Sequence, residues 1–193
     1  AGADIGMLQK ADPTYKYFFC LHANETISRL EQTPKLVIAA LNGHTVGGGL
    51  EVAMAADLRI ARKDCGKFGL PEVALGVLPG TRMLGKSKAI ELMVEGATFG
   101  TDRALELGLI NQVLEGEDFM GQVMAYAQSF TTPGKAAMAV GHIKRSVQTG
   151  AELSLEAGLT LERELQAKLF NSEDAKEGIR SYNEKRKAEF EGR

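Results

Sequence analysis

A glutamate follows three consecutive glycines at the point where a buried strand gives way to a helix. The stretch runs Gly-His-Thr-Val-Gly-Gly-Gly-Leu-Glu from Gly43 to Glu51. Backbone N–H groups at a helix start attract negative charge, and glycines let a ligand approach the backbone itself. Glu51 lies three residues after Gly48 and hence on the same helix face. The pattern favours either a tight turn with a capping glutamate or a catalytic acid or base beside a site for an oxyanion.

A second glycine-rich stretch, Gly80–Ser87, matches the G-x-x-x-x-G-K-[ST] pattern of a phosphate-binding loop. Pro79 at its start and the bulky residues at 82–84 are unusual for a phosphate cradle. No later apolar strand ends in an aspartate that would hold Mg²⁺. A P-loop nucleotide-binding protein is therefore only a distant alternative.

Composition excludes several classes of protein. The chain has 193 residues, 44% of them hydrophobic, which is ordinary globular usage rather than that of a disordered chain. Its net charge of −2 leaves no basic excess for nucleic acid, and no apolar run is long enough to span a membrane. Two cysteines and three scattered histidines indicate no metal site. We expect a cytoplasmic protein, with the mitochondrial matrix as alternative, because the sequence upstream of Ala1 is not visible.

Hydrophobic periodicity predicts the elements that position these residues. Strands are expected at 36–41, 58–61 and 67–69, and a short helix at 50–56. A helix over 13–30 is expected to bury a stripe of Phe18, Leu21, Ile27 and Leu30. The remainder is predicted to be mostly helical, with helices at 87–95, 101–107, 117–130, 135–148, 153–170 and 172–186. This order indicates an α/β core with a C-terminal helical extension.

Six segments, in order, resemble the enoyl-CoA hydratase/isomerase (crotonase) superfamily, and its hydratase branch most closely. They are AGADI at 1–5, IAALNGHTVGGGLEVAMAADLRIA at 38–61, FGLPEVALGVLPG at 68–80, GKSKAIELM at 85–93, TDRALELGLINQV at 101–113 and SEDAKEGIRSYNEKRKAEF at 172–190. The resemblance implies a crotonase-like spiral ββα core, partial over 1–133, and a helical oligomerisation region over 134–193. A homotrimer or homohexamer is expected.

Two features depart from the family pattern. Family members carry several strands before the AGAD segment, and these are absent from this chain. Their loop after Pro-Gly, typically PGxGGTQRL, is longer than the one that follows Pro79 here. We therefore interpret the phosphate-loop pattern as a junction at Thr81–Arg82, which is either a true deletion or a pair of segments that are not consecutive.

The resemblance implies a set of catalytic groups. Ala3 and Gly48 match the backbone N–H donors of an oxyanion hole, each contributing about 3–4 kcal/mol to transition-state stabilisation. Glu51 and Glu72 match the two acids of the hydratase branch, which move protons while water adds to a double bond. A solvated loop acid is the alternative for Glu72.

Further residues are expected to contact the substrate, an acyl-CoA thioester. Asp4, Ile5 and Gly6 follow the oxyanion turn where the pantetheine arm and acyl group would pass, and Leu41 ends the strand near the coenzyme A pocket. Coenzyme A is part of the substrate, so no separate cofactor and no metal are expected.

The implied activity is syn hydration of a trans-2-enoyl-CoA to a 3-hydroxyacyl-CoA. An enoyl-CoA isomerase, or another acyl-CoA lyase or hydrolase of the superfamily, is the main alternative. RNA binding, as in some relatives with a lysine-rich helix, is disfavoured because the helix over 13–30 carries only Lys16 and Arg29 as cations. An inactive structural homologue would be favoured if Glu51 and Glu72 lay far apart.

Overall fold

The structure is a computed structural model that describes residues 2–79 and 85–193. Its contacts form two units. The first comprises the segment up to Glu31 together with Val37–Gln122, and the second comprises Gln32–Leu36 together with Val123–Arg193. The division of the chain into a core over 1–133 and a helical region over 134–193 stays a prediction.

Three parallel strands form the first sheet. β1 (Ile38–Leu41) and β6 (Gln112–Leu114) flank β3 (Leu58–Arg62), with Ala40 opposite Ile60 and Ala61 opposite Val113. The predicted strands at 36–41 and 58–61 are thereby confirmed. β6 is not indicated by the sequence pattern, because three residues are too few to show a period.

The second sheet is small and mixed. β2 (Thr45–Val46) pairs in parallel with β4 (Phe68–Gly69), which pairs antiparallel with β5 (Thr98–Phe99). The predicted strand at 67–69 corresponds to β4. These short strands gain their order from the core beneath them rather than from their own length.

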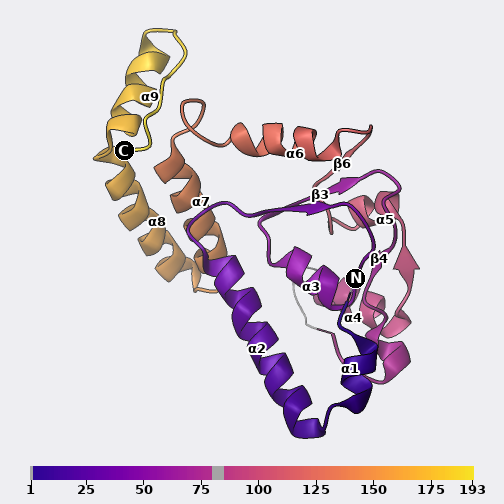
Figure 1. The fold of residues 1–193 in the computed structure, drawn as a ribbon. Coiled ribbons are helices and arrows are strands. Elements are labelled where there is room, and N and C mark those ends of the chain that lie inside the picture. Colours follow the sequence, from indigo (N-terminus) through magenta and orange to yellow (C-terminus); the bar gives the residue numbers. More distant parts are fainter. Residues whose placement is uncertain (1, 80–84) are drawn as a thin grey trace. The chain divides into compact units, whose positions relative to one another are not determined.

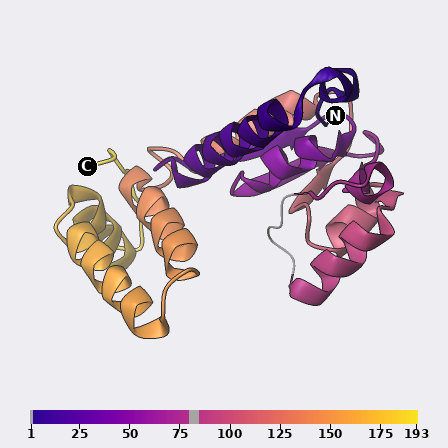
Figure 2. The same cartoon turned by 90° about the horizontal axis from the view of Figure 1, so that it is seen from below.

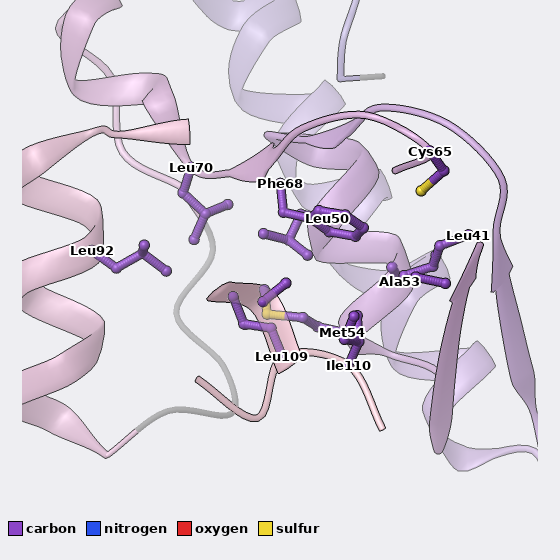
Figure 3. Packing of buried hydrophobic residues seen from close by; sticks show 12 residues of the cluster. Leu41, Leu50, Ala53, Met54, Cys65, Phe68, Leu70, Leu92, Leu109 and Ile110 are labelled. Atoms are coloured by element: carbon purple, nitrogen blue, oxygen red, sulfur yellow. The ribbon is translucent and has the colours of Figure 1, made fainter. Parts of the chain in front are cut away.

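The core of the first unit fixes helix α3 (Gly48–Met54) to strand β4. Figure 3 shows the Phe68 ring against Leu50 of α3, with Leu70 and Met54 nearby. Leu50 and Phe68 are both 0% exposed. Around them lie η1 (Pro71–Leu75), α4 (Lys86–Glu95) and α5 (Thr101–Glu106). Burial of large side chains on α3 and β4 therefore fixes the two segments that carry the predicted acids.

The first helices follow the N-terminal turn. α1 (Ile5–Lys10) is short, and α2 (Pro13–Gln32) confirms the predicted helix. The prediction of a buried stripe on it is wrong, because α2 has no buried residue, with Phe18 58% and Leu21 43% exposed. Apolar spacing shows that a helix can bury one face, but burial also needs a partner surface, which the described residues do not supply.

The second unit is helical. α7 (Ala137–Gly150) and α8 (Leu155–Phe170) lie side by side, and α9 (Glu173–Asn183) follows them (Figure 2). α6 (Phe119–Gln128) spans the division between the units. The Ser172 hydroxyl accepts a hydrogen bond from the Ala175 N–H at 3.0 Å and so caps α9. No helix in residues 2–79 and 85–193 has the length and apolar character needed to cross a membrane.

Candidate active site

Parallel pairing of β2 and β4 brings two chain segments to one edge of the small sheet. The Gly47 N–H donates to the Gly69 carbonyl oxygen at 2.9 Å, just beyond the last strand pair. Chain segments that leave parallel strands emerge on the same side. α3 therefore begins beside η1, and the predicted acids Glu51 and Glu72 are carried by neighbouring segments. Figure 1 shows α3 and β4, the strand that precedes η1, in this part of the first unit.

Glu72 points at the glycine that precedes α3. Its Oε1 lies 2.6 Å from the position that a Cβ on Gly47 would occupy. Its Oε2 is buried and has no hydrogen-bond partner within the described part of the chain. Burial raises the pKa of Glu72, and the nearby negative charge of Glu51 raises it as well. Glu72 is therefore a partly buried, electrostatically coupled acid rather than a solvated loop residue.

Glu51 lies in the first turn of α3 and faces its first residue. Its Oε2 is 3.6 Å from the position of a Cβ on Gly48, and the backbone nitrogen of Ala3 is 3.8 Å from the same point. The carboxylate of Glu51 and the N–H of Ala3 thus border one small space beside Gly48. A Cβ at Gly48 would fit among the protein atoms but would occupy that space.

The N-terminal segment runs along the start of α3. A Cβ on Gly2 would lie 3.2 Å from the Val46 carbonyl oxygen and 3.4 Å from the Gly48 nitrogen. The N–H groups of Leu50 and Glu51 both donate to the Gly47 carbonyl, so the Gly48 N–H precedes the first hydrogen bond of the helix. The predicted donors Ala3 and Gly48 are therefore brought to the same place.

The other predicted substrate-contact residues differ in their burial and local roles. The Asp4 carboxylate accepts a hydrogen bond from the Met7 N–H at 3.1 Å and caps α1, which fixes the turn that holds Ala3. Ile5 is 54% exposed, whereas the Leu41 side chain is buried in the core. Gly6 is exposed, in the first turn of α1. Their roles toward a substrate stay predictions.

The predicted phosphate loop lies largely outside the residues that the structure describes. Residues 80–84, which include the Thr81–Arg82 junction, lie outside the described residues. In the described part of the chain, no group of three or more His, Cys, Asp or Glu residues is arranged to hold a metal ion.

Two glycines outside the predicted site approach Glu72 and its chain neighbours closely. Gly47 has φ +54° and Gly96, which ends α4, has φ +59°, both in the region that favours glycine. A Cβ on Gly96 would lie 2.6 Å from Cγ1 of Val73, the residue after Glu72. The sequence signals them only as a glycine before a helix and a glycine after one, which does not reveal what they face.

Comparisons with known proteins identify the family of this chain. Residues 1–193 match the family model described as enoyl-CoA hydratase/isomerase. The chain is 34% identical to the short-chain-enoyl-CoA hydratase of Clostridium acetobutylicum, covering 98% of this chain and 74% of that protein. It is 32% identical to the crotonyl-CoA hydratase of Syntrophomonas wolfei, with 98% and 75% covered.

Solved structures of related proteins have the same fold. A crystal structure of an enoyl-CoA hydratase from Geobacillus kaustophilus is 44% identical, with a TM-score of 0.94 over 100% of this chain and 75% of that one. The enoyl-CoA hydratase of Bacillus anthracis is 28% identical, with a TM-score of 0.90 over 100% of this chain and 76% of that one. The fold of the described residues is thus that of these structures.

Proposed function

The chain belongs to the enoyl-CoA hydratase/isomerase family, and we propose that it adds water, in the syn sense, across the double bond of a trans-2-enoyl-CoA to give a 3-hydroxyacyl-CoA. The observation that carries the proposal is the meeting of Glu51, Glu72 and the N–H groups of Ala3 and Gly48 at one edge of the small sheet. Coenzyme A enters as part of the substrate, and we propose no separate cofactor or metal.

The two N–H groups would stabilise the charge that develops on the thioester oxygen. Attack of water on C3 moves electron density to this oxygen and gives an enolate. Donors already held in place by a backbone turn lose no freedom during the reaction and contribute about 3–4 kcal/mol each. This role explains why small residues at Gly2, Ala3 and Gly48 allow the two segments to approach closely.

The two glutamates would move the protons. Glu51 accepts a proton from the water whose oxygen bonds to C3, and a protonated Glu72 gives its proton to C2. Burial favours the neutral form of Glu72 because it raises the pKa of that carboxyl, which suits a proton donor. The pair holds one proton before and after the addition, and proton transfer from Glu51 back to Glu72 restores the starting state.

An isomerase is the second candidate, since it also moves a proton to and from carbon beside a thioester. Retention of both acids favours hydration, which has to hold a water molecule as well as the acyl group. Supplying a 3-enoyl-CoA in a parallel assay separates the two activities. Faster conversion of the 3-enoyl substrate than of crotonyl-CoA would favour the isomerase.

The proposed hydration is tested with crotonyl-CoA as substrate, by following the loss of enoyl-thioester absorbance. We expect Glu51→Gln and Glu72→Gln each to lower kcat about 10²-fold or more, because each removes one proton-transfer group. Far-ultraviolet circular dichroism of the variants checks that they are folded. Full activity in both variants would contradict the roles given to these acids.

We also propose a homo-oligomer, a trimer or hexamer, through the helical second unit. Ile143 and Val147 on α7 are 61% and 66% exposed, and Leu155 at the start of α8 is 80% exposed. Burial of such apolar surface between copies is favourable. Light scattering at micromolar concentration is expected to give a multiple of the chain mass, and a monomer mass would contradict the proposal.

A further inference from the structure

Two glycines from different elements closely approach Glu72 or the residues on either side of it. Gly47 precedes α3 and meets the end of the Glu72 side chain, while Gly96 ends α4 and meets the backbone segment that carries it. We propose that Gly47 and Gly96 are positioning residues, which set the place of the Glu72 carboxylate by allowing approaches that no side chain at either position permits. This inference rests on the proposed function only for its effect on activity.

The contact at Gly47 is with the carboxylate itself. A Cβ at this position would lie 2.6 Å from Oε1 and 3.6 Å from the carboxyl carbon of Glu72. Real Cβ atoms do not approach oxygen so closely, so the carboxylate would have to move. Relaxation of the backbone is also restricted, because Gly47 has φ +54° and ψ −134° and its N–H donates to Gly69.

The contact at Gly96 is with the residues on either side of Glu72. A Cβ there would lie 2.6 Å from Cγ1 of Val73 and 3.6 Å from Cα of Pro71. Gly96 is itself held in place, because its N–H donates to the Leu92 carbonyl and Leu92 is buried in the core. A side chain at Gly96 would therefore displace the Val73 side chain of η1, next to Glu72, rather than move α4.

The two contacts together explain how a carboxylate without a described hydrogen bond to Oε2 keeps a defined position. Hydrogen-bond partners hold most buried carboxylates in proteins. Here the carboxyl group has a hydrogen bond from the Glu72 backbone N–H, and Gly47 packs closely against Oε1, which leaves Oε2 available for a substrate. A displacement of about 1 Å in such a group lowers a rate by up to about 10²-fold.

The first test is a double-mutant cycle of Gly47→Ala and Glu72→Ala with crotonyl-CoA. We expect Gly47→Ala to lower kcat by between about 10-fold and about 10²-fold with little change in KM, and to have little further effect when Glu72 is already Ala. Gly43→Ala is the matched control, because a Cβ on Gly43 meets nothing within 4 Å. Losses that multiply in the double variant would overturn the proposal, since Gly47 would then act independently of Glu72.

A thermal-unfolding cycle of the same variants does not depend on the reaction. Gly47→Ala is expected to lower Tm by less in the Glu72→Ala background, because the displaced carboxylate is gone. Equal losses of Tm in both backgrounds would overturn the positioning role. A wild-type protein without hydratase activity would overturn the proposed function, and the thermal cycle would still decide whether Gly47 positions Glu72.

The second cycle pairs Gly96→Ala with Val73→Ala and decides the question if Gly47→Ala does not fold. Val73→Ala removes the methyl group that the new Cβ would meet, so we expect it to restore much of the kcat that Gly96→Ala loses. Gly100→Ala is the control, because Gly100 has nothing within 4 Å of its Cβ position. Failure of Val73→Ala to restore activity would remove Gly96 from the proposal.

Discussion

Carboxylates in the two units of this chain have opposite surroundings. In the second unit, the buried Asp174 accepts hydrogen bonds from the N–H groups of Glu191 and Gly192, at 2.8 and 2.9 Å. Glu177, on the same helix, pairs with Arg180 and Arg186, and these hydrogen bonds lower its pKa strongly. These two acids hold the C-terminal tail to α9.

Glu72 in the first unit has neither kind of support for its buried oxygen. No described residue hydrogen-bonds its Oε2, and burial raises its pKa. A buried polar group without a partner destabilises a fold. Among these three acids, the two that hold structure are paired, whereas the acid for which we propose chemistry has one buried oxygen without a partner among the described residues.

The largest expected difference between the two regions is in activity. Glu72→Gln is expected to lower kcat for crotonyl-CoA hydration about 10²-fold or more, whereas Glu177→Gln keeps kcat near the wild-type value. Both variants replace a carboxylate by an amide, so a difference in kcat between them reflects the surroundings of the two glutamates. A comparable loss of kcat in Glu177→Gln would remove the distinction between the two regions.

For stability we expect the larger loss in the second unit, where the carboxylates are hydrogen-bonded. Asp174→Ala leaves two backbone N–H groups without their acceptor and should lower the free energy of unfolding by about 1–3 kcal/mol. Denaturant unfolding measures this loss, with Glu162→Ala on the exposed side of α8 as control.

Glu72→Gln removes a partly buried charge and is expected to leave the free energy of unfolding equal or higher. A marked destabilisation by Glu72→Gln would show that the acid holds structure after all.

The smallest expected effect is on the pH dependence of stability, and its sign is opposite for Glu72 and Glu177. Glu72 has a raised pKa in the folded state, so its contribution to stability falls as pH rises from its ordinary value of 4.5 through the raised value. Glu177 has a lowered pKa, so it stabilises above 4.5 and this contribution is lost as pH falls.

At neutral pH, Glu72→Gln should therefore be the more stable and Glu177→Gln the less stable relative to wild type. The Glu72→Gln difference should shrink as pH falls toward 4.5, whereas the Glu177→Gln difference should persist down to about 4.5 and shrink only as pH falls further. The range to cover therefore runs from neutral pH to well below 4.5. Tm measured across this range checks both signs in one experiment. If the Tm advantage of Glu72→Gln over wild type grew as the solution became more acidic, the account of Glu72 would be contradicted.

Much of this arrangement follows from the sequence. The apolar run that ends at Leu41 predicts β1, and the resemblance to a known family names Glu51 and Glu72 before any geometry is known. By contrast, periodicity misses β2, although its pairing with β4 is what brings the two acids together. Strands of two residues depend on long-range packing, which no local pattern records.

Burial is also hard to predict from spacing alone. Phe18 and Leu21 have helical spacing yet lie exposed on α2, because a sequence does not say which face finds a partner. The close approaches of Gly47 to Glu72 and of Gly96 to Val73 are likewise beyond prediction, since close approaches between distant segments leave only a glycine as their signal. The oligomeric state and the cellular compartment stay predictions.

The most direct test of the proposed hydration follows the oxygen atom of water. Crotonyl-CoA is incubated with the wild-type protein in water enriched in a heavy oxygen isotope, and the thioester product is analysed by mass spectrometry. We predict a 3-hydroxyacyl-CoA that carries the heavy oxygen, formed far more slowly by Glu51→Gln and Glu72→Gln. Recovery of unlabelled crotonyl-CoA alone from the wild-type reaction would contradict the central claim.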